Sequence, residues 1–217
     1  MTQITHWING ALDVQKPQRS GEVFNPATGK VTKTVAFADA TTVDRAVSAA
    51  SEAFATWRHS SLTKRTQVLF AFRELVQQNK EKIAALITDE HGKVLSDAAG
   101  EVTRGLEVVE FACGIPHLLK GGFSEEVSSG VDVYSIRQAL GPVAIISPFN
   151  FPAMVPMWFF PVAIACGNTV VVKPSEKIHL QQCLWRSYGK RLDCQTVSLT
   201  CFTATKKQLM HFLFTQE

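Results

Sequence analysis

The sequence lacks the features that mark a membrane, secreted or metal-binding protein. Its longest apolar segment, residues 151–166, is broken by three prolines, so no run reaches the roughly 18 residues that a membrane span needs. The odd number of cysteines, five, and the lack of a signal-peptide pattern predict a reducing, cytoplasmic location. His91 and His117 have no carboxylate or cysteine at a metal-ligand spacing, so we expect no metal site.

The sequence also has no large excess of positive or negative charge. The net charge of +3 comes entirely from residues 178–217, which leaves residues 1–177 neutral and without a basic face for nucleic acid. The sequence contains no G-x-G-x-x-G and no G-x-x-x-x-G-K-[ST] motif, so a glycine-rich phosphate loop cannot support a functional prediction. The remaining composition, 46% apolar and 19% charged, is typical of a globular protein.

The first 120 residues predict a short antiparallel lead-in followed by helices. Segments 6–10 and 22–38 alternate around the turn residues Asn25-Pro26 and Thr28-Gly29, which predicts strands joined by turns. Apolar residues at helical spacing then predict four helices. They span 39–57 with Thr41 or Thr42 as N-cap, 62–79, 80–92 with Gly92 as C-cap, and 96–119 ending near Pro116.

After residue 122 the pattern changes to one of strands. Residues 131–140 alternate, and 141–148 and 167–174 are short apolar runs on either side of a helix-length apolar segment, 153–166. Strand, helix and strand of these lengths predict a right-handed unit with two parallel strands, and hence an α/β fold. Ligands bind at the carboxyl ends of such strands. The loops 147–152 and 173–177 are therefore the candidate functional edge.

Asn150 is the first candidate for chemistry at this edge. Its amide could donate a hydrogen bond to an oxygen that gains negative charge when a carbonyl is attacked. Spacing alone favours a simpler role as the cap of the following helix, and one residue can do both. Cys113 and Cys166 lie on apolar faces without a neighbouring base, which indicates core residues rather than nucleophiles.

Three charged residues allow two interpretations each. Lys173 and Glu176 could bind the hydroxyls of a ribose, or could form an ion pair on a solvated turn. Arg104 could bind a substrate carboxylate with both arms of its guanidinium. From spacing alone, a salt bridge to Glu101 or Glu107 is the better interpretation.

Long strings of the sequence resemble a known enzyme family. "FNPATGKV" and "SPFNFPAMVPMWFFPVAIACGNTVVVKPSEK" resemble the aldehyde dehydrogenase superfamily, and "DEHGKVLSDAAGEVTRGLEVVEFACGIPHLLKG" with "VDVYSIRQALGPVA" resembles its CoA-acylating methylmalonate-semialdehyde dehydrogenases. The resemblance runs from about His6 to Lys177. It implies that residues 1–177 are the N-terminal part of a Rossmann-like NAD-binding domain, with residues 123–140 as an oligomerisation arm and a homo-tetramer as the full-length assembly.

The resemblance also implies an activity and roles for residues. The activity is NAD-dependent oxidation of malonate or methylmalonate semialdehyde, with CoA as the acyl acceptor. By similarity, Asn150 would be the oxyanion donor and Arg104 would help to hold the substrate carboxylate. The NAD site would comprise Ser147, Phe149, Lys173, Glu176 and Lys177. Ala139 replaces a proline usual in the family, a small change at a strand edge.

Residues 178–217 do not continue the resemblance. The family continues "KPSEKDPSAA", whereas Ile178 and His179 follow Lys177 here. Synonymous back-translation of the tail, when its codons start at the third base, permits a family-like continuation nearly throughout. We therefore hypothesise that one base was lost at the Lys177 codon, in the gene or in its sequencing. We expect a non-native, irregular tail, which sequencing of the locus tests.

The expected consequence is an inactive fragment of a dehydrogenase. The family's nucleophilic cysteine and general-base glutamate would come after the "KPSE" turn, and no residue from 178 onward resembles either region. The alternative is a non-catalytic remnant that binds a nucleotide or pairs in an oligomer, with a full-length paralogue, through residues 131–140. A relative of ordinary aldehyde dehydrogenases without CoA dependence is disfavoured only by the subfamily strings.

Overall fold

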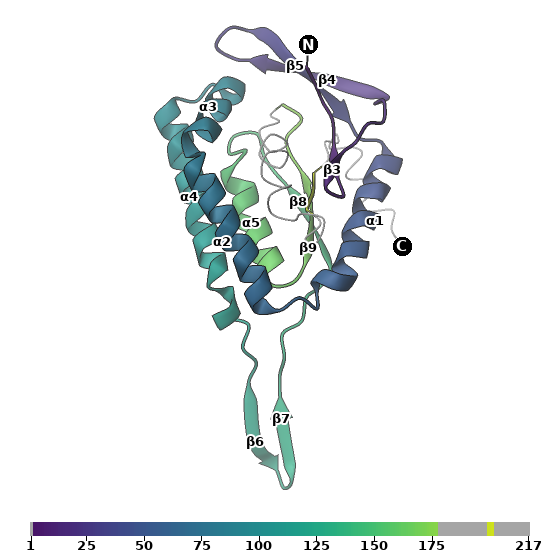
Figure 1. Ribbon diagram of the computed structural model, residues 1–217, viewed down its shortest axis with the longest axis vertical. Helices are drawn as coiled ribbons and strands as arrows, with labels where there is room; N and C mark the ends of the chain where they lie inside the picture. Colours follow the sequence, from purple (N-terminus) through teal and green to yellow (C-terminus); the bar gives the residue numbers. More distant parts are fainter. Residues whose placement is uncertain (1, 178–198, 202–217) are drawn as a thin grey trace.

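The protein has an α/β fold, seen here in a computed structural model that describes residues 2–177 and 199–201 (Figure 1). Its helices are α1 (Ala40–Trp57), α2 (Leu62–Gln78), α3 (Lys80–His91), α4 (Leu95–Cys113) and α5 (Met154–Ala165), with a 3₁₀ turn at Ile115–His117. Its strands are β1 (Thr2–Ile4), β2 (Trp7–Ile8), β3 (Ala11–Leu12), β4 (Arg19–Asn25), β5 (Lys30–Phe37), β6 (Phe123–Ser128), β7 (Val131–Tyr134), β8 (Pro142–Ile146), β9 (Thr169–Lys173) and β10 (Leu199–Cys201).

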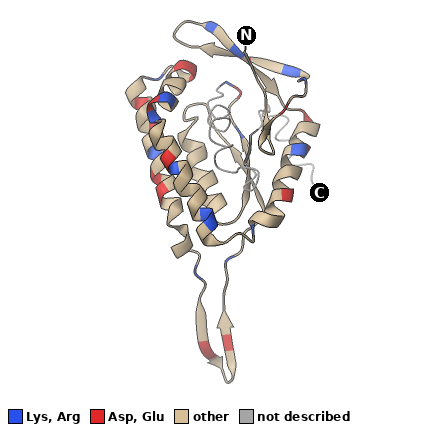
Figure 2. Cartoon of the chain, in the orientation of Figure 1, with Lys and Arg blue, Asp and Glu red and all other residues tan. Residues whose placement is uncertain are grey.

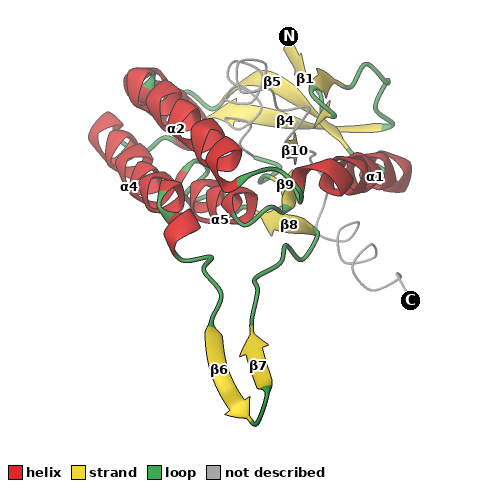
Figure 3. Cartoon of the chain, turned by 60° about the horizontal axis from the view of Figure 1, so that its bottom comes forward, coloured by secondary structure: helices red, strands yellow, loops and turns green. Residues whose placement is uncertain are grey.

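The central feature is a five-stranded sheet in the order β3-β2-β10-β9-β8. Strands β8 and β9 are parallel neighbours, and α5 connects them, as the pattern of residues 141–174 predicts. The register places Val143 beside Val170 and Ile145 beside Val172. In Figures 1 and 3, α1 lies on one side of these strands, and α5 with α2 and α4 lies on the other.

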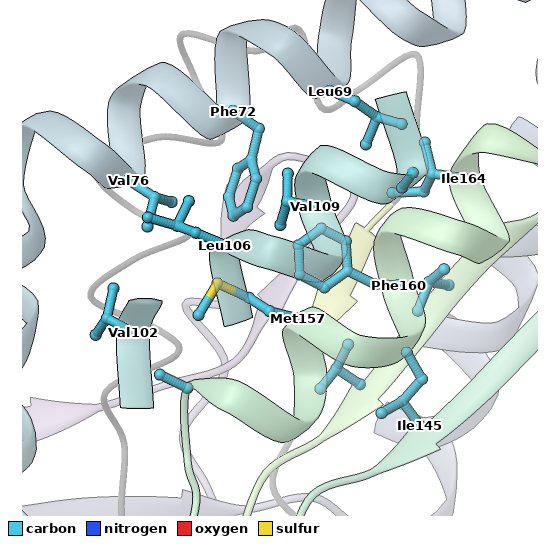
Figure 4. Close-up of a cluster of buried hydrophobic side chains, with 14 of the residues drawn as sticks. Leu69, Phe72, Val76, Val102, Leu106, Val109, Ile145, Met157, Phe160 and Ile164 are labelled. Carbon is cyan, nitrogen blue, oxygen red and sulfur yellow. The ribbon is translucent and has the colours of Figure 1, made fainter. Parts of the chain in front are cut away.

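Strand β9 is buried on both faces, which explains its continuous apolar sequence. Val170 and Val172 belong to a large core cluster with residues of α2, α3, α4 and α5, whereas Val171 belongs to a smaller cluster with α1. In the large cluster, the rings of Phe72 and Phe160 meet edge to face with centroids 5.1 Å apart (Figure 4). The side chains of this one strand, which point alternately to its two faces, therefore pack against helices on both sides of the sheet.

The N-terminal strands form a second sheet, β1-β5-β4, at one end of the molecule (Figure 1). The predicted antiparallel hairpin is present as β4 and β5. Strand β1, however, pairs with β5 in parallel. The lead-in is therefore antiparallel within its hairpins only. Strand β1 adds to the free edge of β5 and runs parallel to it.

A two-stranded arm, β6 with β7, projects from the other end (Figures 1 and 3). The strand predicted over residues 131–140 is shorter than expected, because its pairing ends where Tyr134 meets Phe123, the first residue of β6. Beyond this pair the chain comes close to itself at Gly121, where an added Cβ would lie only 1.7 Å from the carbonyl oxygen of Ser135. Side chains along the arm are exposed.

Two predicted helix ends differ from those in the structure. Helix α1 is capped by Asp39, not by Thr41 or Thr42, because the Asp39 carboxylate accepts the backbone N–H of Thr42 at 2.8 Å. Helix α4 ends at Cys113 rather than near Pro116, because a proline has no backbone N–H to continue the helical hydrogen bonds, and the chain goes on as the 3₁₀ turn Ile115–His117. The C-cap at Gly92 is confirmed, with a positive φ of 85°.

The surface carries mixed charge. Figure 2 shows Lys and Arg interspersed with Asp and Glu along the helices. Within the described ranges, no helix is both long and apolar enough to cross a membrane, and no three potential metal ligands gather. Of the predicted non-native tail, residues 178–217, only Leu199–Cys201 is described, as strand β10. The prediction for the rest of the tail lies outside the described residues.

Candidate functional site

The candidate site lies where β8 and β9 end. The backbone N–H of Ser147, one residue beyond β8, donates to the carbonyl oxygen of Lys173 at 2.9 Å, and both residues are buried. This bond extends the parallel ladder by one step and places the two predicted loops, 147–152 and 173–177, side by side. The βαβ geometry therefore brings together residues that are 26 positions apart in the sequence.

Lys173 and Glu176 form an ion pair at this edge, with Lys173 Nζ 3.1 Å from Glu176 Oε2. The lysine side chain is 8% exposed and the glutamate side chain 46%, so the pair is not the fully solvated one that spacing also allowed. Partial burial alone would raise the pKa of Glu176. Hydrogen bonds from its own backbone N–H and from Lys173, with the charges of Lys173 and Lys177, outweigh burial and lower the pKa. A carboxylate acceptor therefore faces outward beside a sheltered ammonium donor.

Phe149 links the two loops. The Lys177 ammonium lies 5.6 Å from the centroid of its ring, and the His91 ring stacks on it with centroids 4.7 Å apart. Burial lowers the pKa of His91, and the nearby charge of Lys93 lowers it further while that of Glu101 opposes the change. His91, considered from the sequence only as a metal ligand, thus packs against a residue of the predicted NAD site.

Asn150 does not cap helix α5. The N-cap position belongs to Ala153, which has no side-chain acceptor. The cap is provided instead by Glu101 of α4, whose Oε1 accepts the backbone N–H groups of Ala153 at 2.8 Å and of Met154 at 3.1 Å. Its carboxylate is fully buried and also places negative charge at the positive end of the helix dipole. The interpretation of Asn150 as the cap of this helix is therefore wrong. Its side chain is exposed, so its amide can still contact a bound molecule.

Lys93 completes this arrangement. Its Nζ donates to Glu101 Oε2 at 2.6 Å and to the backbone carbonyl oxygen of Asn150 at 2.8 Å. The same ammonium lies 4.5 Å from the centroid of the Phe151 ring. The residues from Asn150 to Met154 are thus held at both ends by one buried ion pair.

Arg104 is exposed and lies near the same loop, with its guanidinium carbon 6.0 Å from the centroid of the Phe151 ring. The salt bridges that spacing favoured are absent, because Glu101 is buried against Lys93 and, within the described chain, Arg104 has no carboxylate within 4.0 Å. Its guanidinium is therefore available next to the residue that follows Asn150. This position fits the predicted role in binding a carboxylate.

The two cysteines of residues 2–177, Cys113 and Cys166, are held in the thiol form. Burial is the main cause that raises the pKa of both Cys113 and Cys166. A protonated thiol is a poor nucleophile. These side chains are therefore part of the core, as the sequence predicted, rather than catalytic groups.

Sequence reasoning missed the importance of residues 89–93, at the junction of α3 and α4. His91 and Lys93 contact the loop that carries Phe149 and Asn150. Asp89 and Glu90 contact the N-terminal hairpin, by accepting from Asn25 Nδ2 at 2.7 Å and from Lys33 Nζ at 2.8 Å respectively. No spacing rule pairs Lys93 with residues some 57 positions away, so only the fold could reveal the junction.

The sequence profile of the aldehyde dehydrogenase family matches residues 14–187, which is most of the chain. The chain belongs to the aldehyde dehydrogenase family. It is 50% identical over 177 residues to malonate-semialdehyde dehydrogenase of Pseudomonas aeruginosa, covering 82% of this chain and 35% of that protein. It is 47% identical over 175 residues to the mitochondrial, acylating methylmalonate-semialdehyde dehydrogenase of Arabidopsis thaliana, covering 81% of this chain and 29% of that one.

Solved structures of aldehyde dehydrogenases share the fold. Methylmalonate-semialdehyde dehydrogenase from Oceanimonas doudoroffii matches with a TM-score of 0.90 and 44% identity, over 100% of this chain and 44% of that one. A Sinorhizobium meliloti structure complexed with NAD matches with a TM-score of 0.85 and 39% identity, over 96% of this chain and 42% of that one. The chain thus spans about a third of the length of the curated relatives and under half of the solved ones.

Proposed function

We propose that this chain supplies the NAD-binding edge and the oxyanion donor of a CoA-acylating dehydrogenase that oxidises malonate or methylmalonate semialdehyde. The observation that carries the proposal is the Lys173–Glu176 pair at the carboxyl end of β9, beside the loop that presents Asn150. The names of the relatives support the substrate class, and the word acylating in one of them supports CoA as acceptor.

The donor and acceptor set at the edge fits the ribose of NAD. Glu176 can accept hydrogen bonds from two ribose hydroxyls, while Lys173 donates to a ribose oxygen or a phosphate. Ser147, Phe149 and Lys177 line the same edge. NAD, when bound, accepts a hydride from the substrate. The residues of this chain orient the cofactor and exclude water from one side of it.

Asn150 and Arg104 would act on the aldehyde. The exposed amide of Asn150 donates to the aldehyde oxygen as negative charge develops there, which lowers the barrier to attack. Arg104 binds the carboxylate of the semialdehyde, and this contact would select a carboxylate-bearing aldehyde over a neutral one. Since Cys113 and Cys166 are held as thiols, neither cysteine of residues 2–177 is suited to act as the nucleophile. We therefore expect binding of NAD without turnover by this chain alone.

Titration of NAD into the purified chain, followed by calorimetry, tests this function. Substitution K173M removes a charged donor and should weaken binding by roughly tenfold or more, since a hydrogen bond to a charged group contributes about 1.5–3 kcal/mol. E176Q should weaken binding less, because the amide keeps one acceptor oxygen. K30M, at an exposed lysine of the N-terminal hairpin, is the control. No binding of NAD, or equal affinities for K173M and K30M, would contradict the assignment.

A second test addresses turnover. Addition of NAD, CoA and malonate semialdehyde to the chain should give no rise in absorbance from NADH. A steady rise that survives further purification would show that the chain carries its own nucleophile.

The alternative role, pairing with another copy, is favoured by the arm. Exposed apolar side chains cover it, and they are Phe123, Val127, Val131, Val133 and Tyr134. Such a concentration of apolar surface is typical of an interaction surface. We propose that the arm joins copies of this chain, in line with the tetramer that the family resemblance implies. Light scattering should show an oligomer that V133K dissociates, whereas a monomeric wild-type chain would contradict this role.

A further inference from the structure

The contacts around Asn150 raise the question of what fixes its direction. Residues 147–153, between β8 and α5, form no regular helix or strand. Beyond the Ser147 N–H, which donates to Lys173, the sheet ladder does not continue along these residues. A donor on such a loop needs support from outside to keep one orientation. An oxyanion donor loses effect when it is misplaced, because its contribution depends on a distance of about 3 Å to the developing charge.

That support comes from two charged residues to which neither the sequence motifs nor the proposed NAD contacts assign a functional role. Glu101 holds the C-terminal side of the loop, by accepting the N–H groups of Ala153 and Met154. Lys93 holds the other side, by donating to the carbonyl oxygen of Asn150. The ion pair between them is short, 2.6 Å, and its side chains are 11% and 0% exposed.

The cost of this pair argues for a role beyond stability. Burying two charges is expensive, and apolar residues of similar volume often stabilise a fold as well or better. Here the charges lie at the loop that carries the proposed oxyanion donor, and each one contacts the backbone of that loop. The peptide unit that joins Asn150 to Phe151 is planar, so fixing its carbonyl oxygen also fixes its N–H and one backbone torsion of Asn150.

We propose that Lys93 and Glu101 are positioning residues, which orient Asn150 toward the oxygen of the bound aldehyde. The inference rests on the proposed role of Asn150 in catalysis. It assigns neither residue to the chemistry itself. Lys93 sets the direction of the donor, and Glu101 sets where helix α5 begins and so how far the loop extends.

The direct readout is the Phe151 amide, which belongs to the peptide unit that Lys93 holds. In the full chain labelled with ¹⁵N, relaxation should give this amide an order parameter near that of rigid backbone, about 0.85, and K93M should lower it below about 0.6. K93R keeps a donor and should restore most of the order. R45M is the control, because it breaks another ion pair with a buried carboxylate, Arg45 of α1 with Asp13 at 2.6 Å, which takes no part in the junction at residues 89–93.

The control separates positioning from stability. Both K93M and R45M should lower the urea midpoint, but only K93M should free the Phe151 amide. If K93M lowers the midpoint and leaves the order parameter of Phe151 unchanged, Lys93 has a structural role only, and the proposal is overturned.

Glu101 has its own test. E101Q keeps an oxygen for the Ala153 and Met154 amides but turns an N–H group toward Lys93. Hydrogen exchange of the Ala153 and Met154 amides should stay slow in E101Q. In E101A it should become roughly tenfold to hundredfold faster, since these amides lose the charged carboxylate that accepts their hydrogen bonds. If the variants do not fold, hydrogen exchange of the same two amides in the wild-type chain still tests the cap. Exchange of both amides at the rate of exposed ones would exclude the cap.

Titration of NAD into the same samples keeps the two proposals apart. If NAD does not bind while Phe151 still depends on Lys93, the proposed function fails, and the ion pair remains the device that orders this loop. If NAD binds but the Phe151 amide is indifferent to K93M, the positioning inference fails alone.

Discussion

The buried imidazole of His6 should make the fold sensitive to mild acid. Its ring is 4% exposed, and burial is the main cause that lowers its pKa from 6.5 to about 4, with Arg45 acting in the same direction and Asp13 and Asp39 opposing it. Between these pH values the unfolded chain binds a proton that the folded chain does not. Stability is therefore fully present above pH 6.5 and is lost as the pH falls toward 4.

The size of the loss in stability follows from how far the pKa of His6 is lowered. A difference of about 2.5 pH units, at 1.36 kcal/mol per unit, corresponds to about 3 kcal/mol lost between pH 7 and pH 4. This is a large part of the roughly 5–15 kcal/mol that stabilises a typical domain. Asp13, Asp39 and Glu176 have lowered pKa values, and they weaken the fold only as the pH falls below about 4.5.

Urea unfolding at pH steps from 7.5 to 4.5 measures this effect. The free energy of unfolding of the wild-type chain should fall with a slope that approaches 1.4 kcal/mol per pH unit from His6. His91, with its lowered pKa, adds to the slope in the same direction. H6Q removes one titrating group and should flatten the curve, whereas H59Q, at an exposed histidine, should not. Parallel curves for wild type and H6Q would refute the reasoning.

Four further substitutions test packing and capping by the same unfolding assay. In helix α4, G105A would place a Cβ 2.3 Å from Met157 Cε and should destabilise by about 1–3 kcal/mol. G100A, which meets nothing within 4 Å, should stabilise by up to about 1 kcal/mol. Equal effects of the two would contradict the close packing of α4 on α5. D39A should cost about 1 kcal/mol as the lost cap of α1, and T41A, the cap that the sequence suggested, should cost less than half of that.

The sequence predicts the elements of this fold better than their ends. The unit formed by β8, α5 and β9 follows from apolar run length and flanking glycine and proline, which are local signals. The cap of α1 was misplaced because Asp39, Thr41 and Thr42 all suit an N-cap, and the choice depends on where the chain enters the helix from β5. The strand at 131–140 was predicted too long because alternation indicates a strand but cannot show where its partner stops.

The residues of the candidate site, likewise, are predictable from the sequence only in part. Asn150, Lys173 and Glu176 stand at the ends of predicted strands, so topology alone brings them to one edge. Lys93 lies in the short connection between α3 and α4, Glu101 lies on α4, and their importance arises from contacts across 52 to 57 residues. A charge in a helical pattern normally predicts a solvated face, and nothing in the pattern distinguishes a carboxylate that is fully buried.

The junction at residues 89–93 also means that the N-terminal hairpin is part of the support of the site. Asn25 and Lys33 tie the hairpin to Asp89 and Glu90, and an added Cβ at Gly92 would lie 2.7 Å from the Pro26 ring. The next residue along the chain, Lys93, holds the Asn150 loop. A protease nick or a truncation among the first 37 residues should therefore loosen a loop that it never touches, and screening of shortened versions by solubility alone would miss that damage.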